Sequence, residues 1–284
     1  MSMSNTDKHL VWIEVDLAKV RRNCRAVRDF AGNAEIIAVL KCNAYGHGAV
    51  PVAKALRREG VRFFGVSSVA EAVELRDAGI DDAILNVGCF APGEAPAVVE
   101  NGIIQAVFSR AGAVKLDEAA SRLGKNARVH IKIDTGLGRF GVLHREAADF
   151  VEYVRGLTNI SVEGIFSVLS EDHDVDKIQI RRFRSVLAEL DRNGVDPGKV
   201  HLVSSAGVLD WPQGYFDAVR PGMMLLGIYP NAKYRLARKI ELRPSLTLKA
   251  RVARVAKIPA GESIAYSRKY ILTRDTSIAT LNMG

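Results

Sequence analysis

Eight short apolar segments that alternate with amphipathic segments predict an α/β fold, in which a closed barrel is followed by a smaller, mainly-β domain. Most of the apolar segments are nearly continuous, as expected for parallel strands buried on both faces. Eight strand–helix units over roughly 200 residues match a TIM (β/α)8 barrel in number and size. After Tyr229-Pro230 the helical pattern stops and a strand pattern follows. A doubly wound sheet is the alternative, but that fold rarely needs eight regular repeats.

The first predicted elements are a strand over residues 10–16, which we expect to pack with the β domain, and a helix over residues 17–30. The eight barrel strands are predicted over residues 35–41, 62–66, 83–87, 104–108, 128–134, 160–167, 199–204 and 217–220. The segments between these strands have helical periodicity. In residues 69–78, for example, Ala70 and Val73 lie on one side of a helix and Glu71 and Glu74 on the other.

We expect the barrel domain to span residues 1–239 and a partial C-terminal β domain to span residues 240–284. In residues 244–258 apolar residues such as Leu246 and Leu248 alternate with polar ones, which predicts a strand with one buried face. Only about three strands fit before the chain stops, so we expect a truncated domain whose edge strands lack partners.

Composition indicates a globular protein, with 48% hydrophobic and 25% charged residues. The net charge of +8 could indicate an acidic partner such as nucleic acid or a membrane surface. However, the lysines and arginines are scattered, and their densest groups, such as Arg57-Arg58, are pairs. A solvated basic surface is the better interpretation, and we expect neither a nucleic-acid partner nor a membrane partner.

The cysteines argue against a disulfide framework and a structural zinc site, because Cys24, Cys42 and Cys89 are widely spaced and form no CxxC pair. We therefore expect no metal. The first 20 residues contain no signal-peptide pattern, and no apolar run approaches the roughly 20 residues of a membrane helix. We expect a cytoplasmic protein.

In a barrel of this kind the reacting groups lie at the carboxyl ends of the strands, and a phosphate site often follows strands seven and eight. The residues at these ends are Lys41 on the first strand, Lys132 and Asp134 on the fifth, Ser204 and Ser205 on the seventh, and Arg220 before Gly222 on the eighth. Serine hydroxyls and backbone N–H groups around a glycine suit a phosphate, because glycine permits close approach.

Lys41 has two interpretations. A lysine at the end of a buried strand is more often paired or extended toward solvent than catalytic. It can also be a desolvated amine whose pKa falls far enough for attack on a carbonyl. The anion site expected across the barrel favours the second interpretation. A lysine on one side and a phosphate site on the other could hold the two ends of pyridoxal 5'-phosphate (PLP).

Five segments resemble motifs of the alanine racemase family. The segment AVLKCNAYGHG (Ala38 to Gly48) closely resembles the PLP-lysine signature of that family. The other four follow in the family's order: KIDTGLGRFG from residue 132, HLVSSAG from 201, VRPGMMLLGIYP from 219 and GESIAYS from 261. The resemblance spans the chain from Val11 onward, and a motif as long as the first is specific.

The resemblance implies a PLP-dependent amino-acid racemase, an isomerase with alanine as its default substrate and a role in supplying D-alanine for the cell wall. Lys41 would form the Schiff base with PLP and act as one of two acid/base groups. Arg139 would contact the substrate carboxylate and the cofactor, and Lys132 falls where many members carry a carbamylated lysine. The other cofactor-binding residues implied are Tyr45, Leu85, Ser204, Ser205, Arg220, Gly222 and Met223.

Arg220 would face the pyridine nitrogen of the cofactor. Because an arginine keeps its proton, that nitrogen would stay unprotonated, and the weaker electron sink would favour proton return over side reactions. Tyr266 would be the second acid/base group, supplied by a neighbouring subunit, which implies a homodimer with a shared active site. By itself a tyrosine is more often a core residue with a satisfied hydroxyl, and only the motif assigns Tyr266 this role.

Two departures from the family keep alternatives open. Val168 stands where the family usually has a histidine that links the arginine at the ring nitrogen to the catalytic tyrosine, and His173 in the following loop is expected to be solvated. The chain also stops where the family would continue toward the substrate entrance. A PLP-binding homologue with impaired catalysis is therefore one alternative, and a racemase for serine or a basic amino acid is another.

A third alternative is a different PLP barrel enzyme, such as a decarboxylase, an aldolase or a carrier protein. Single-domain carriers lack a β domain, so the strand pattern after Pro244 argues against them.

Overall fold

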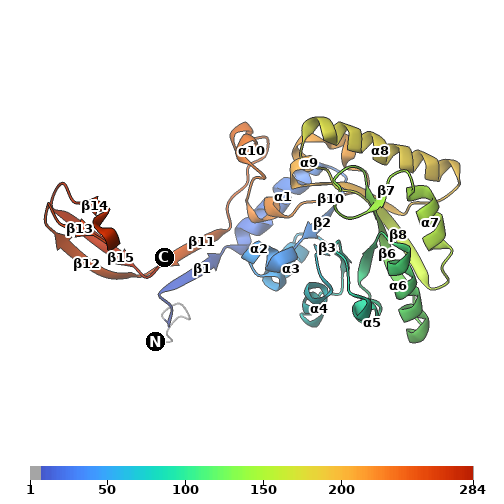
Figure 1. Cartoon of the computed structure of the whole chain (residues 1–284), viewed down its shortest axis with the longest axis horizontal. Coiled ribbons are helices and arrows are strands. Elements are labelled where there is room, and N and C mark those ends of the chain that lie inside the picture. Colours follow the sequence, from blue (N-terminus) through green and yellow to red (C-terminus); the bar gives the residue numbers. More distant parts are fainter. Residues whose placement is uncertain (1–7, 284) are drawn as a thin grey trace. The chain divides into compact units, whose positions relative to one another are not determined.

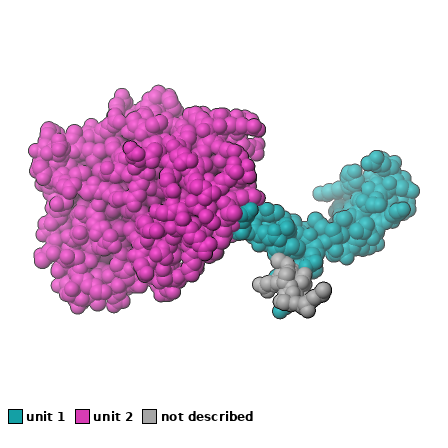
Figure 2. Space-filling view, turned by 180° about the vertical axis from the view of Figure 1, so that it is seen from behind, with its two compact units in different colours: residues 1–16, 246–284 teal, residues 17–245 magenta. Residues whose placement is uncertain are grey.

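The computed structural model describes residues 8–283 and divides them into two compact units (Figures 1 and 2). The larger unit comprises residues 17–245, and the smaller unit joins residues 8–16 to residues 246–283. Among the described residues, no helix has both the length and the apolar character needed to cross a membrane.

The larger unit is the predicted barrel. Its eight parallel strands are β2 (Glu35–Val39), β3 (Phe63–Val66), β4 (Ala83–Asn86), β5 (Ile104–Val107), β6 (Ala127–Asp134), β8 (Ile160–Phe166), β9 (Lys199–Ser204) and β10 (Ala218–Arg220). The ring is complete because β10 pairs with β2 and β5 pairs with β6. This closure confirms the barrel and excludes an open doubly wound sheet. A short strand, β7 (Val142–Leu143), adds to β6 outside the ring.

Helices surround the barrel strands (Figure 1). They are α1 (Leu17–Ala31), α3 (Ala49–Arg57), α4 (Val69–Asp77), α5 (Ala95–Glu100), α6 (Arg110–Leu123), α7 (Ala147–Arg155), α8 (His173–Arg192) and α9 (Ser205–Asp210). A further short helix, α10 (Ala232–Ala237), follows the last barrel strand in the chain. Helix α6 illustrates how local residues set the ends of these helices. The Ser109 hydroxyl accepts a hydrogen bond from the N–H of Gly112 at 3.2 Å, and Gly124 ends the helix at a φ of 60°. Both are favoured end signals, since serine caps a helix N-terminus and glycine tolerates positive φ.

The first barrel strand ends at Val39 rather than at residue 41 as predicted. The segment α2 (Lys41–Gly46) follows, and residues 42–45 within it have positive φ. A strand cannot continue into this conformation, so Lys41 begins a turn instead of ending a strand.

The smaller unit consists of two-stranded ribbons. Strand β1 (Val11–Val15) pairs antiparallel with β11 (Leu246–Ala250), β12 (Val252–Ile258) with β15 (Thr276–Leu281), and β13 (Ser263–Ile264) with β14 (Tyr270–Ile271). The prediction of one strand with a buried face over residues 244–258 is wrong. The segment divides between β11 and β12, and the side chains of Leu248 and Val255 are 53% and 68% exposed. Two-stranded ribbons cannot bury a face without a second layer.

Candidate active site

One cavity of about 270 Å³ lies at the carboxyl ends of the barrel strands. Its lining includes nine residues singled out from the sequence: Lys41, Tyr45, Lys132, Arg139, Ser204, Ser205, Arg220, Gly222 and Met223. The remaining lining residues are Val39, Val87, Phe166, Val168 and Glu171. The barrel therefore brings together residues from strands far apart in the sequence, as expected for the C-terminal face of this fold.

Two predicted site residues do not line this cavity. Leu85 is fully buried inside the barrel, in an apolar cluster with Ile37, Phe63 and Ile104. Tyr266 belongs to the smaller unit, where its side chain is 97% exposed in the single chain.

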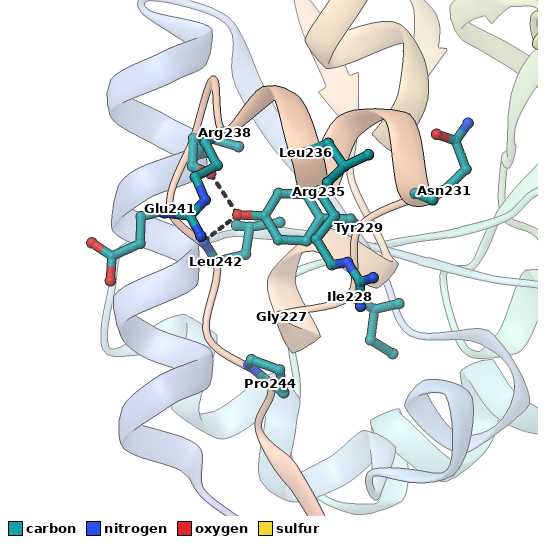
Figure 3. Close-up of a pocket in the computed structure, with 12 residues that line it drawn as sticks. Gly227, Ile228, Tyr229, Asn231, Arg235, Leu236, Arg238, Glu241, Leu242 and Pro244 are labelled. Carbon is teal, nitrogen blue, oxygen red and sulfur yellow. Dashed lines mark hydrogen bonds between the residues drawn. The ribbon is translucent and has the colours of Figure 1, made fainter.

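A larger cavity of about 1120 Å³ contains none of the predicted residues (Figure 3). The chain segment 227–244 supplies all of its lining, and the Tyr229 hydroxyl lies there, donating to the carbonyl of Ile240 at 2.7 Å and accepting from the N–H of Leu242 at 3.1 Å. Its charged residues, Arg235, Arg238 and Glu241, offer no convergent set of reacting groups. The smaller cavity, with its lysines, arginines and serines, is therefore the candidate active site.

A left-handed turn presents Lys41 and Tyr45 to the cavity. Residues Cys42, Asn43, Ala44 and Tyr45 have φ values of 51° to 53° and ψ values of 40° to 49°. The left-handed conformation costs about 1–2 kcal/mol for each non-glycine residue, so four in succession must be held by their surroundings.

Glu71 in α4 is the main anchor of this turn. Its Oε1 accepts the N–H of Cys42 at 2.5 Å, and its Oε2 accepts the N–H of Ser67 at 2.8 Å and the Ser67 hydroxyl at 3.1 Å. One carboxylate thus joins the loop after β3 to the residue that follows Lys41. At the other end of the turn, Asn43 Oδ1 accepts the N–H of Ala49 at 2.7 Å, and His47 Nδ1 lies 3.2 Å from the carbonyl oxygen of Tyr45.

Tyr45, Ser205 and Gly222 form a close-packed polar group at one side of the cavity. The Ser205 hydroxyl accepts the N–H of Gly222 at 3.1 Å, and a Cβ atom on Gly222 would lie 2.7 Å from the Tyr45 hydroxyl oxygen. Only glycine leaves this space open. Burial raises the pKa of the Tyr45 phenol to about 12, so the phenol stays protonated and can donate a hydrogen bond.

Arg220 is held from behind by a chain of buried histidines. Its Nη1 lies 2.6 Å from His201 Nδ1, and His201 Nε2 lies 2.8 Å from His130 Nδ1. The guanidinium can only donate, so His201 accepts at Nδ1 and donates from Nε2 to His130. Arg220 Nη2 also donates to the carbonyls of Ser167 and Leu202, at 2.6 and 2.9 Å.

Burial keeps both histidines neutral. Desolvation, followed by nearby cations that include Lys199 and Arg220, lowers the pKa of His130 to about 3, and the pKa of His201 falls well below its usual value for the same reasons. Burial also lowers the pKa of Arg220 to about 9, which leaves the guanidinium charged at neutral pH. The result is one buried cation supported by neutral partners.

Lys132 is also buried, and its surroundings disfavour its charged form. Desolvation comes first and the cations Arg220 and Arg139 follow, and together they lower the pKa of Lys132 to about 8. Its ammonium donates to the carbonyl of Val87 at 3.3 Å. A lysine with this pKa is a stronger nucleophile near neutral pH than an ordinary surface lysine.

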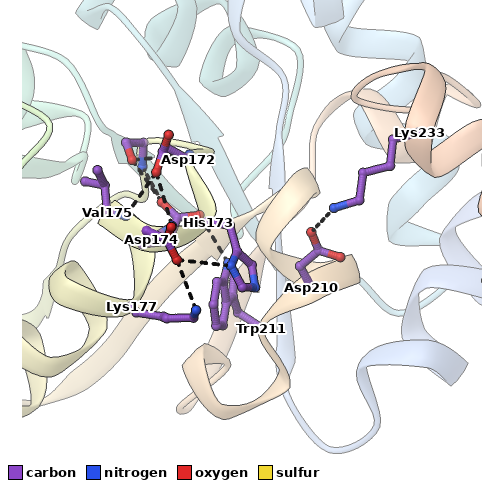
Figure 4. Close-up of polar contacts among 10 residues, drawn as sticks. Asp172, His173, Asp174, Val175, Lys177, Asp210, Trp211 and Lys233 are labelled. Atoms are coloured by element: carbon purple, nitrogen blue, oxygen red, sulfur yellow. Dashed lines mark hydrogen bonds and ion pairs between the residues drawn. The ribbon is translucent and has the colours of Figure 1, made fainter.

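The loop after β8 completes the cavity with Val168 and Glu171. Val168 provides no side-chain hydrogen bond, as the sequence indicated. His173, at the start of α8, does not line the cavity; it stacks on Trp211 with ring centroids 4.9 Å apart and lies 3.6 Å from Asp174 (Figure 4). Sequence reasoning gave no role to Glu71, His130 or Glu171, although a histidine inside the apolar strand β6 was a visible signal.

The chain matches two family models, the alanine racemase N-terminal domain over residues 15–230 and the alanine racemase C-terminal domain over residues 245–284. It is 39% identical to the alanine racemase of Carboxydothermus hydrogenoformans over 279 residues, which cover 96% of this chain and 75% of that one. It is 36% identical to the alanine racemase of Methanococcus maripaludis, over a match that covers 97% of this chain and 75% of that one.

Solved structures of alanine racemases have the same fold as this chain. Alanine racemase from Clostridium difficile 630 superposes with a TM-score of 0.91 at 32% identity, covering 98% of this chain and 74% of that one. Alanine racemase from Bacillus anthracis, solved with bound L-Ala-P, superposes with a TM-score of 0.87 at 31% identity, with 97% and 73% covered. Fold and matches define the class of protein as an amino-acid racemase, an isomerase. The chain belongs to the alanine racemase family, which confirms the resemblance seen in its motifs.

Replacing Glu71 by alanine is expected to lower the free energy of unfolding by about 2–3 kcal/mol, because the N–H groups of Cys42 and Ser67 lose a charged acceptor. Urea unfolding of the purified chain measures this. Glu74→Ala removes an exposed carboxylate from the same helix and should change stability by less than about 0.5 kcal/mol. Equal effects of the two substitutions would show that Glu71 does not anchor the turn.

Stability is expected to fall with acidification below about pH 6.5. The folded pKa of His130, about 3, lies below its unfolded value, so the unfolded chain binds one more proton between these values. Between pH 7 and pH 5 this histidine alone should lower the free energy of unfolding by about 2 kcal/mol. Urea unfolding at both pH values tests this. His130→Asn should remove that part of the pH dependence, whereas His173→Asn, which replaces an exposed histidine, should retain it.

Proposed function

We propose that the chain interconverts L- and D-alanine with PLP as cofactor, using Lys41 and Tyr266 as its two acid/base groups. The observation that carries this proposal is the cavity itself, where Lys41 and a phosphate-compatible group of Tyr45, Ser205 and Gly222 line one space. The alanine racemase names of the relatives support alanine as the substrate.

The residues of the cavity fit PLP. Lys41 would hold it covalently, while the hydroxyls of Tyr45 and Ser205 and the backbone at Gly222 and Met223 would hold its phosphate. A Cβ on Gly222 would fill this cradle, which is why a glycine there supports a ligand that approaches the backbone closely. The cations Lys132, Arg139 and Arg220 suit an anionic cofactor and a substrate carboxylate.

When bound, PLP withdraws electrons from the substrate α-carbon and so acidifies its proton. Arg139 would bind the substrate carboxylate and fix its orientation. Lys41 Nζ would take or return the proton on one face of that carbon. Arg220 commits both Nη atoms to His201 and to backbone carbonyls, so its Nε–H is the group that would donate to the cofactor while keeping its proton.

Racemisation needs a second proton carrier on the opposite face of the α-carbon. We assign this role to Tyr266 of a second copy of the chain, in a homodimer with shared active sites. Two observations support it: Tyr266 is almost fully exposed in one chain, and its neighbours Ala265 and Ser267 have φ values of 61° and 63°. Such strain persists where the surroundings require it, often at functional sites.

Lys132 would support Arg139 as a carbamylated lysine. Its pKa of about 8 leaves part of the amine neutral near neutral pH, and a neutral amine is the form that adds to CO2. The product would be an anion, which would replace a disfavoured buried cation beside two arginines.

A second candidate function is PLP binding with impaired catalysis. Val168 favours it, because this residue lines the cavity at the family's histidine position and supplies no side-chain hydrogen bond there.

Incubation of L-alanine with the purified chain and PLP is expected to give D-alanine, measured by chiral chromatography. Lys41→Ala should give none, because the cofactor is not held and one proton carrier is lost. Wild-type protein that shows a Lys41-dependent cofactor absorbance but forms no D-alanine would instead support the second candidate. Absence of both signals would contradict each candidate.

Mixing two inactive variants is expected to restore activity if the sites are shared. Lys41→Ala and Tyr266→Phe should each be inactive alone. In a heterodimer one site combines an intact lysine with an intact tyrosine, so random exchange of subunits should recover about a quarter of wild-type turnover. A mixture that stays inactive after confirmed subunit exchange would show that Tyr266 acts within its own chain or not at all.

A further inference from the structure

We infer that Glu171 gives this site a preference for amino acids with a cationic side chain, such as lysine or arginine. The inference rests on the proposed racemase function and names its substrate class. Four cationic side chains line the cavity, and Glu171 is the only acidic residue in the lining. Around the barrel, Glu171 follows β8, between the loop of Arg139 after β6 and the serines at the end of β9.

The backbone at Glu171 is held in a fixed and strained conformation. Its φ is 67°, which is uncommon for a residue other than glycine. The buried carboxylate of Asp176 accepts its N–H at 3.1 Å and the N–H of Ser170 at 3.0 Å, and accepts the Trp211 indole N–H at 3.1 Å. These contacts tie the loop to α8 and to Trp211. The backbone position of Glu171 is therefore set by hydrogen bonds to the buried carboxylate of Asp176.

The neighbouring carboxylates all have partners, whereas that of Glu171 has none among the described residues. Asp172 accepts the N–H groups of Asp174 and Val175, Asp174 pairs with Lys177 at 3.1 Å, and Asp210 pairs with Lys233 at 3.2 Å (Figure 4). No such contact involves the side chain of Glu171. Glu171 is exposed, so a carboxylate that forms no such contact is open to a cation that the substrate brings.

A substrate would use both kinds of charge in this cavity. Its carboxylate suits Arg139, while an ammonium or guanidinium at the end of its side chain would form a charge-assisted hydrogen bond with Glu171. The methyl group of alanine reaches no such partner. A hydroxyl, as in serine, would form the weaker neutral counterpart. The geometry therefore favours long cationic side chains over small ones.

The test compares L-lysine with L-norleucine, which has a similar chain without the ammonium group. Binding of each to the PLP-loaded protein is measured from the change in cofactor absorbance, and turnover of L-lysine and L-alanine by chiral chromatography. We expect the wild type to bind L-lysine at least tenfold more tightly than L-norleucine. Glu171→Gln should lower this ratio tenfold or more, and should lower the lysine-to-alanine ratio of kcat/KM to a similar extent.

Glu74→Gln removes an exposed carboxylate that does not line the cavity and should keep both ratios. The inference would be overturned if the wild type bound L-norleucine as tightly as L-lysine, or bound neither. It would also be overturned if both ratios were unchanged in the Glu171→Gln variant. The proposed function is judged separately. If D-alanine forms but no preference depends on Glu171, the proposed function stands and the inference is rejected. If the binding preference depends on Glu171 but no amino acid is racemised, the proposed function is rejected and the binding preference stands.

Discussion

The hydrogen bond from the N–H of Cys42 to the Glu71 carboxylate holds the residues on which the site depends. Four left-handed residues follow Lys41, and such a conformation is unstable in an isolated peptide. The barrel provides its anchor because β2 and β3 are paired neighbours, which brings the start of α4 next to the end of β2. Together with the hydrogen bond from the N–H of Ala49 to Asn43, this contact holds Lys41 and Tyr45 at the cavity.

Burial and charge then shape the chemistry at the other side of the barrel. Arg220, His201 and His130 come from three strands and form a buried row in which only the arginine is charged. A neutral histidine can accept one hydrogen bond and donate another without adding a charge. The guanidinium of Arg220 is therefore the charged group of this row. The same desolvation that neutralises the histidines makes Lys132 a weaker cation.

The loop after β8 supplies two cavity residues of contrasting chemistry. Val168 lines the cavity with a side chain that forms no hydrogen bond, and Glu171 follows it three positions later with a carboxylate. Both residues lie on a loop fixed by Asp176 and Trp211 rather than in the barrel strands. Loops on a rigid scaffold can change specificity while the fold is retained. Membership of the family and the inferred preference for a particular side chain thus depend on different parts of the molecule.

Periodicity and motifs in the sequence determined the barrel, because strands buried on both faces leave continuous apolar segments, and they also identified most of the residues around the cavity. Contacts distant in sequence decided the rest. The left-handed turn depends on Glu71, 29 residues beyond Cys42, and the histidine row joins residues 71 positions apart. The exposure of Leu248 and Val255 was likewise hidden, since alternation reveals an apolar face but not whether anything covers it. Local sequence encodes conformational preference, whereas burial and charge pairing arise only when separate segments meet in the folded chain.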